Sequence, residues 1–226
     1  MLACKNGHDP CALQLIEAGA KLEAVNKYGD TALMLACKYG HDPCVLVMIE
    51  AGAAVDQTDE DGWTALMFAC QNGHDRVTLQ LIKAGADVNL VIEEAGAGNT
   101  VYDNYGNTAL MLACQEGHDQ CALQLIDAGV DYNKATNEGL TALMFSCQNG
   151  HDACVLQLIK AGAYIEQIDE NGKTALMFAC QFGHDRVALQ LIEAGADVDQ
   201  IDEKGKTALM FAEQFVYSQR RLLPNP

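Results

Sequence analysis

Ten cysteines and six histidines are the residues of this chain best suited to chemistry, and most of them recur in one spacing. The pattern Cys-x3-His-x2-Cys occurs four times: Cys4, His8 and Cys11; Cys37, His41 and Cys44; Cys114, His118 and Cys121; Cys147, His151 and Cys154. Thiolates and imidazoles at such short spacings are the ligands of zinc sites. A cysteine beside a histidine is also the pair used in nucleophilic catalysis. The spacing therefore raises three uses to test: metal binding, catalysis and disulfide formation.

Further copies of the motif argue against all three uses. The slot of Cys44 holds Val77 in one copy and Val187 in another, although Cys70 and His74 stay in place. A position that exchanges a thiol for valine indicates a small buried apolar slot. No fourth ligand follows locally, and near-identical copies leave no unique pocket for catalysis. We therefore predict no catalytic residue, no metal and no cofactor.

Disulfides are also disfavoured. Equivalent cysteines of neighbouring copies should lie about 8–10 Å apart, as packed helices do, beyond the roughly 7 Å that a disulfide spans. Pairing within one copy stays open. Free thiols indicate a reducing compartment, the cytosol or the nucleus.

The elements that carry these residues repeat along the chain. The phrase Thr-Ala-Leu-Met occurs six times, in steps of 33, 44, 33, 33 and 33 residues, starting at Thr31, Thr64, Thr108, Thr141, Thr174 and Thr207. In the copy over 53–86, an acidic turn precedes Thr64, which can cap a first helix. Gly73 then ends that helix, and His74 is expected to cap a second helix. Each copy is thus a turn followed by two helices, which must stack on a neighbour to bury its apolar face.

This unit resembles the ankyrin repeat. The family signature Gly-x-Thr-Pro-Leu-His-x-Ala, Gly-His and Leu-Leu-x-x-Gly-Ala-Asp-x-Asn appears here over 62–69, 73–74 and 81–89, and the likeness covers nearly the whole chain. The resemblance implies an all-α ankyrin-repeat solenoid, with helix–turn–helix units joined by short β-hairpin loops. Alanine replaces the family's proline, and Met67 replaces the histidine that hydrogen-bonds within and between units. We expect Met67 and its equivalents to act as apolar filler.

The repeats predict one domain over 1–226. It comprises a partial unit over 1–20, five complete units with helices starting near 31, 64, 108, 141 and 174, and a divergent cap over 207–221 that should form one helix before a loose tail. Met1 aligns with Met34, so the sequence opens in the middle of a unit. This favours a second hypothesis, a regulatory module of a larger protein such as a channel, an enzyme or an effector. An engineered repeat array is a further alternative.

An 11-residue insertion near 90–100 accounts for the 44-residue step. We favour a lengthened hairpin with strands over 90–94 and 99–103. The alternative is a second helix that extends or kinks through 91–95. The insertion either lies on the binding face or is a tolerated loop without a role.

Charge narrows the class of partner. The chain has 31 Asp and Glu against 14 Lys and Arg, a formal net charge of −17. Such a field repels nucleic acid and attracts a basic protein surface. No apolar run is long enough for a membrane helix, and no signal peptide is visible.

Partner-binding residues are predicted where the copies differ, at the hairpins and at the ends of the first helices. In ankyrin-repeat proteins these positions lie on the concave face that contacts partners. Exposed aromatic residues among polar neighbours are typical of binding hot spots, although scattered surface aromatics can also be ordinary. The predicted binding residues are Tyr28, Tyr39, Trp63, Tyr105, Leu140 and Phe182, with a rim of Asp59, Glu60, Asp61, Asp169 and Glu170.

A leucine recurs in every second helix: Leu13, Leu46, Leu79, Leu123, Leu156 and Leu189. We expect these leucines to be buried by a small rotation of the helix. The alternative is a convex apolar ridge able to self-associate. Together these patterns predict a non-catalytic scaffold for protein–protein interaction.

Overall fold

The computed structural model describes residues 1–92 and 106–222, which are almost entirely helical. Residue contacts divide the chain into two compact parts. The N-terminal part comprises Met1–Ala113 with Gln120–Val130, and the C-terminal part comprises Cys114–Asp119 with Asp131–Pro226. Each part is described by itself below. The prediction of a single domain is not tested by this division and stays a prediction.

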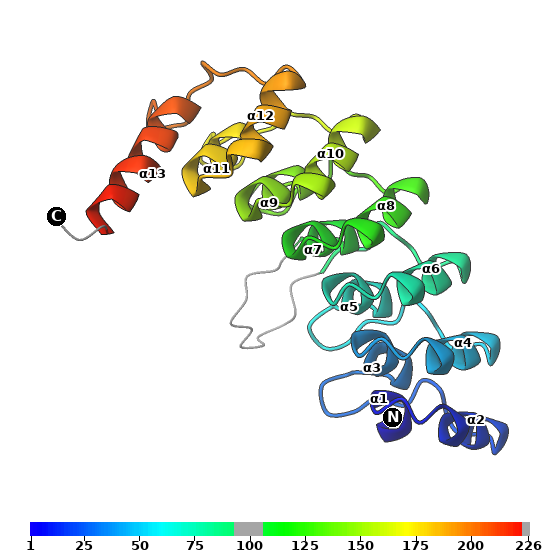
Figure 1. Ribbon diagram of the computed structural model, residues 1–226. Coiled ribbons are helices and arrows are strands. Elements are labelled where there is room, and N and C mark those ends of the chain that lie inside the picture. Colours follow the sequence, from blue (N-terminus) through cyan, green and yellow to red (C-terminus); the bar gives the residue numbers. More distant parts are fainter. Residues whose placement is uncertain (93–105, 223–226) are drawn as a thin grey trace. The chain divides into compact units, whose positions relative to one another are not determined.

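In the N-terminal part, short helices alternate as first and second members of a repeat (Figure 1). Their bounds are α1 Leu2–Lys5, α2 Asp9–Glu17, α3 Ala32–Lys38, α4 Asp42–Glu50, α5 Ala65–Gln71 and α6 Asp75–Lys83. First helices pack on first helices (α1 on α3, α3 on α5), and second helices pack on second helices (α2 on α4, α4 on α6). The boundary between the two parts falls within the next repeat, formed by α7 Ala109–Glu116 and α8 Asp119–Asp127.

The C-terminal part continues the same alternation. Its helices are α9 Ala142–Asn149, α10 Asp152–Ala161, α11 Ala175–Phe182, α12 Asp185–Glu193 and α13 Ala208–Leu222. The first helices α9, α11 and α13 pack in series, and α10 packs on α12. The divergent last repeat is the single helix α13, as predicted, and it ends one residue beyond the predicted cap. None of the helices in the described residues combines the length and apolar character that crossing a bilayer requires.

Threonine begins each first helix and glycine ends it, as predicted. Thr64 has extended backbone angles, and its hydroxyl accepts the N–H of Met67 at 3.2 Å. This bond satisfies one of the amides that a helix leaves unpaired at its start. Met67 is 1% exposed, and its sulfur accepts the N–H of Thr64 at 3.5 Å. The methionine is therefore the buried filler that we expected and also a weak acceptor within the cap.

The prediction that the histidines cap the second helices is wrong. His41, His74, His151 and His184 occupy the N-cap position, but none makes a side-chain cap bond. Each ring instead uses Nε2 to bond a carbonyl of the preceding repeat, 36 residues earlier: Lys5 at 2.9 Å, Lys38 at 3.2 Å, Gln115 at 3.0 Å and Gln148 at 3.0 Å. A carbonyl accepts only from a protonated nitrogen, so each of these bonds requires the tautomer with hydrogen on Nε2.

The glycine that ends a first helix is needed for this bond. Gly117 has φ of +77°, a conformation that glycine adopts freely. A Cβ at Gly117 would lie 2.5 Å from Nδ1 of His151. Glycine therefore both turns the chain and leaves room for the histidine ring of the next repeat.

The prediction that the second-helix leucines are buried is also wrong. Leu13, Leu46, Leu79, Leu156 and Leu189 are 38–54% exposed, and Leu123 is half-buried. In α6 the buried side chains are Val77, Thr78 and Leu81. Leu79 is two residues from Val77, about 200° around the helix, and therefore faces away from the core.

The hairpin loops contain only isolated β-bridges in the described residues: Thr58 with Thr64, Val91 with Thr108 and Ala135 with Thr141. Their bases close by a recurring pair of bonds. In one hairpin the N–H of Asp59 donates to Trp63 O and that of Gly62 donates to Asp59 O. These bonds make the loops hairpin-like without forming extended strands.

The insertion begins after Ile92. The N–H of Ile92 donates to Asn107 O at 3.0 Å, and the N–H of Gly106 donates to Ile92 O at 2.9 Å. Ile92 thus takes the structural slot that Asp59 holds, although Asp103 would fill that slot by sequence spacing. Helix α6 ends at Lys83, so the alternative helix does not reach 91–92. The rest of both alternatives lies outside the described residues.

The histidine bonds predict a stability difference between repeats. His151→Ala leaves the Gln115 carbonyl without its partner and a void beside Gly117, which should lower the free energy of unfolding by about 1–2 kcal/mol. His8 holds the same N-cap slot but is exposed and makes no such bond among the described residues. His8→Ala is therefore the matched control, with an expected effect below about 0.5 kcal/mol. Urea unfolding of both variants checks this, and equal losses would contradict the role of the ring.

Candidate protein-binding surface

A groove of about 630 Å³ in the N-terminal part contains five of the predicted binding residues: Tyr28, Tyr39, Asp59, Asp61 and Trp63. The hairpins before α3 and α5 supply Tyr28, Asp59, Asp61 and Trp63, and the C-terminal end of α3 supplies Tyr39. The close approach of neighbouring hairpins positions these residues, because the N–H of Glu60 donates to Tyr28 O at 3.2 Å. Repeat stacking thus gathers side chains that lie up to 35 residues apart in sequence.

Aromatic rings form the wall of this groove. Trp63 stacks on Phe68 with ring centroids 5.1 Å apart and planes inclined by 25°. Lys38 lies over the Phe68 ring at 4.9 Å, and Lys5 lies over the Tyr39 ring at 5.6 Å. Tyr28 and Tyr39 are 59% and 45% exposed, so both offer ring surface to a partner. Large rigid rings beside charged groups can anchor a protein partner.

The carboxylate of Asp59 organises its own hairpin. Its Oδ1 accepts the N–H of Asp61 at 2.9 Å and the N–H of Trp63 at 2.8 Å. Burial raises the pKa of Asp59 to about 6, and the neighbouring charges of Asp30 and Asp61 add to this rise, although the two backbone bonds oppose it. Asp59 therefore positions Trp63, while the exposed Glu60 is free to meet a partner.

The remaining predicted binding residues do not line this groove. Tyr105 lies outside the described residues, and Leu140, Phe182, Asp169 and Glu170 belong to the C-terminal part. Phe182 is 39% exposed, but Asp169 is 8% exposed. The Oδ1 atom of Asp169 accepts the N–H of Asn171 and of Lys173, so this carboxylate holds a turn as Asp59 does. Their roles in binding stay predictions.

The cysteine–histidine motifs are divided between the core and the interface of adjacent repeats. Cys37 and Cys147 are fully buried, and burial raises the pKa of both thiols well above the ordinary range. The Cys44 thiol donates to Asp9 Oδ1 at 2.9 Å, and burial followed by this bond raises its pKa. Thiols held protonated are poor zinc ligands and poor nucleophiles. The described residues contain no group of three or more His, Cys, Asp or Glu that could hold a metal.

Sequence reasoning missed the contacts between cysteines of different repeats. A side-chain hydrogen bond joins Cys114 to Cys154 in the next repeat, and this bond is the largest cause of the raised pKa of Cys114. Only equivalent cysteines were expected to approach each other, whereas this pair joins a first-helix slot to a second-helix slot. Lys5, Lys38 and Phe68, which complete the groove, were missed as well. Their signal was available, since the groove residues of one hairpin face the first helix of the repeat on either side.

Asp59 gives a pH prediction. Its folded pKa of about 6 exceeds the ordinary 3.8, so folding binds the proton more tightly and stability falls as pH rises from about 4 to about 6. Asp59→Asn keeps an oxygen for the two N–H groups and removes the charge. At about pH 7.5 we expect the variant to be more stable than wild type by up to about 1 kcal/mol, allowing for solvent screening, with the difference gone near pH 4.

Urea unfolding across this pH range measures the difference. Asn26 fills the equivalent slot one repeat earlier, and its Oδ1 accepts the N–H of Tyr28 and Asp30, so an amide is compatible with the turn. Glu60→Gln removes an exposed charge from the same hairpin and should have no such effect. A variant less stable than wild type at pH 7.5 would show that the charge is needed.

Comparison with known proteins agrees with the repeat architecture. The family model for ankyrin repeats (three copies) matches residues 1–92, 88–169 and 163–220. The crystal structure of the human ASB11 ankyrin repeat domain is similar to this chain, with a TM-score of 0.82 and 25% sequence identity, covering 99% of this chain and 97% of that one. No curated protein sequence matches. Ankyrin repeats are generally protein–protein interaction modules, and their fold is generally non-catalytic. The predicted all-α solenoid is confirmed, and the chain belongs to the ankyrin-repeat family.

Proposed function

We propose that this protein is a non-catalytic scaffold that binds a partner protein through the N-terminal groove. The observation that carries this proposal is the aromatic wall of Trp63, Phe68 and Tyr39 beside a hairpin of three acidic residues. Trp63 is the only tryptophan of the chain, and the same slot holds Asp30 in the preceding repeat, so the fold does not require an indole there. A large ring at such a position is available for recognition.

The partner should present an apolar side chain with basic residues around it. Lys5 and Lys38 already lie over Tyr39 and Phe68, so cations of the partner would meet Glu60 and Asp61 at the edge of the groove. The net charge of −17 would steer a basic surface toward the protein.

The cysteines support a reducing compartment, the cytosol or the nucleus. All ten are free in the structure, and seven are at most 1% exposed within the helical core: Cys37, Cys44, Cys70, Cys114, Cys121, Cys147 and Cys154. Their function there is to fill space, which oxidation would disturb.

Trp63→Ala tests the groove. Wild-type protein and the variant serve as baits in the native lysate, and mass spectrometry identifies proteins that only the wild type retains. For the partner so found, we expect the variant to weaken binding about 30-fold, as removal of a central aromatic residue typically does. Thermal unfolding of the variant confirms that the stack with Phe68 is not needed for folding.

Tyr164→Ala is the matched control. Tyr164 is an aromatic residue of the C-terminal part that is 69% exposed and does not line the groove. Its removal should leave the retained proteins and their affinities unchanged. Partners captured equally by wild type and by Trp63→Ala would exclude the groove as the binding site.

A further inference from the structure

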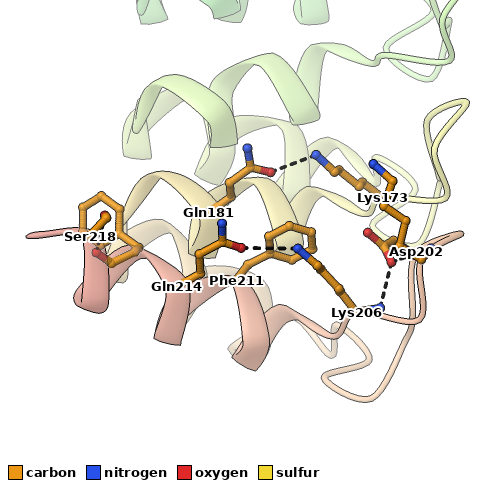
Figure 2. Close-up of a pocket in the computed structure, with 9 residues that line it drawn as sticks. Lys173, Gln181, Asp202, Lys206, Phe211, Gln214 and Ser218 are labelled. Atoms are coloured by element: carbon orange, nitrogen blue, oxygen red, sulfur yellow. Dashed lines mark hydrogen bonds between the residues drawn. The ribbon is translucent and has the colours of Figure 1, made fainter.

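A second groove, of about 380 Å³, lies in the C-terminal part between the last hairpin and helices α11 and α13 (Figure 2). It is lined by Lys173, Lys204, Lys206, Phe211, Gln214 and Ser218, among others. Three of the chain's 14 basic residues thus meet in one place on a protein with 31 acidic residues. This local excess of positive charge is opposite in sign to the chain as a whole.

Neutral amides hold two of the ammonium groups. Lys173 Nζ donates to Gln181 Oε1 at 2.9 Å, and Lys206 Nζ donates to Gln214 Oε1 at 3.3 Å, as Figure 2 shows. Both ammonium groups also lie beside the Phe211 ring, at 5.3 Å and 5.4 Å from its centroid. Two cations are therefore fixed beside one aromatic ring.

No carboxylate neutralises these cations. Within the described part of the chain, no carboxylate oxygen lies within 4 Å of Nζ of Lys173, Lys204 or Lys206; the ion pairs found there are Arg76 with Asp42 and Arg186 with Asp152. Asp202 is the acidic residue that lines the groove, and it is 5% exposed. Its Oδ1 accepts the backbone N–H of Lys204 at 2.9 Å and of Lys206 at 2.7 Å. Asp202 is thus engaged in the turn, and the lysine heads remain available.

The fold does not demand these lysines. Lys173 and Lys206 occupy the slot after the hairpin glycine in successive repeats, and the same slot holds Asp30, Trp63, Asn107 and Leu140 elsewhere. Each of those repeats forms the same capped first helix without a cation. A pair of lysines repeated in adjacent copies therefore serves something other than folding.

We propose that this C-terminal groove is a docking site for an acidic segment of a partner protein, with Asp or Glu carboxylates on Lys173, Lys204 and Lys206 and an apolar side chain against Phe211 and Phe215. Charge complementarity commits the site to carboxylates, since three cations converge where one engaged carboxylate is present. The volume suits a few residues of an extended segment rather than a folded surface. The site is independent of the N-terminal groove and opposite to it in charge.

Selection from a random octapeptide library tests the preference. The full chain should enrich peptides that carry Asp and Glu together with one large apolar residue. The double variant Lys173→Gln with Lys206→Gln should not, because it keeps polar side chains but removes both charges. A wild-type selection with no excess of acidic residues would overturn the proposal.

Fluorescence anisotropy of the best labelled peptide then measures affinity. We expect the double variant to bind about tenfold more weakly or worse, and the Asn/Gln version of the peptide to lose binding to wild type by a similar factor. The matched control is Lys83→Gln with Lys160→Gln, two exposed lysines at the ends of α6 and α10, which changes net charge equally. Equal affinity of the Lys173/Lys206 variant and wild type would overturn the proposal.

Two further measurements distinguish an acidic-segment site from the N-terminal groove and from a general anion site. Trp63→Ala should leave acidic-peptide binding unchanged, so the two grooves can succeed or fail independently. Circular dichroism melting of each variant confirms its fold. Competition by inorganic phosphate as strong as by the carboxylate peptide would show a general anion site and overturn the assignment to an acidic protein segment.

Discussion

The bond from a histidine ring to a carbonyl of the preceding repeat joins one helix pair to the next, and the rest of the structure depends on it. The helices apart from α13 contain 4–10 residues, lengths at which an isolated helix is marginal in water. They persist because each is packed on a neighbour. The ring of His74 fixes that neighbour by bonding Lys38 O, and the glycine at the end of the neighbour's first helix leaves space for the ring. The interface between repeats is thus what makes the sequence helical.

This shared interface leaves other positions free to vary. The slot after the hairpin glycine holds an indole at Trp63 and an ammonium at Lys173 and Lys206, with the same capping threonine following each time. Aromatic groups with acidic neighbours therefore line the groove of one part, and cations line the groove of the other. The chain changes the chemistry of its surface without changing its fold.

Local signals predicted the helices well, because their causes are local. The Thr64 cap and the Gly73 stop involve residues within one helix, and both were found from sequence. The histidine side chains were assigned wrongly since their partners lie 36 residues away, which spacing within one repeat does not reveal. Leu79 was expected to be buried because it is apolar, yet its place on the helix puts it opposite Val77.

The binding residues were predicted in part for a related reason. Tyr28, Tyr39 and Trp63 were selected by type, and stacking brings them into one groove. The lysines of the C-terminal groove were visible in the sequence as variable residues. Only their convergence, with no carboxylate beside them, distinguishes them from ordinary surface lysines.

The hairpin base at Ile92 and Gly106 has a consequence for how such a chain can change in length. Its two bonds, which join Ile92 to Asn107 and to Gly106, are those that close an ordinary hairpin, so the helices on either side meet the same boundary as in any other repeat. Added residues beyond this base cost little, because closure entropy rises by only about 0.6 kcal/mol for each doubling of a loop. This position can therefore accept foreign sequence, such as a reporter peptide or a second recognition loop, while the neighbouring helix pairs keep their register.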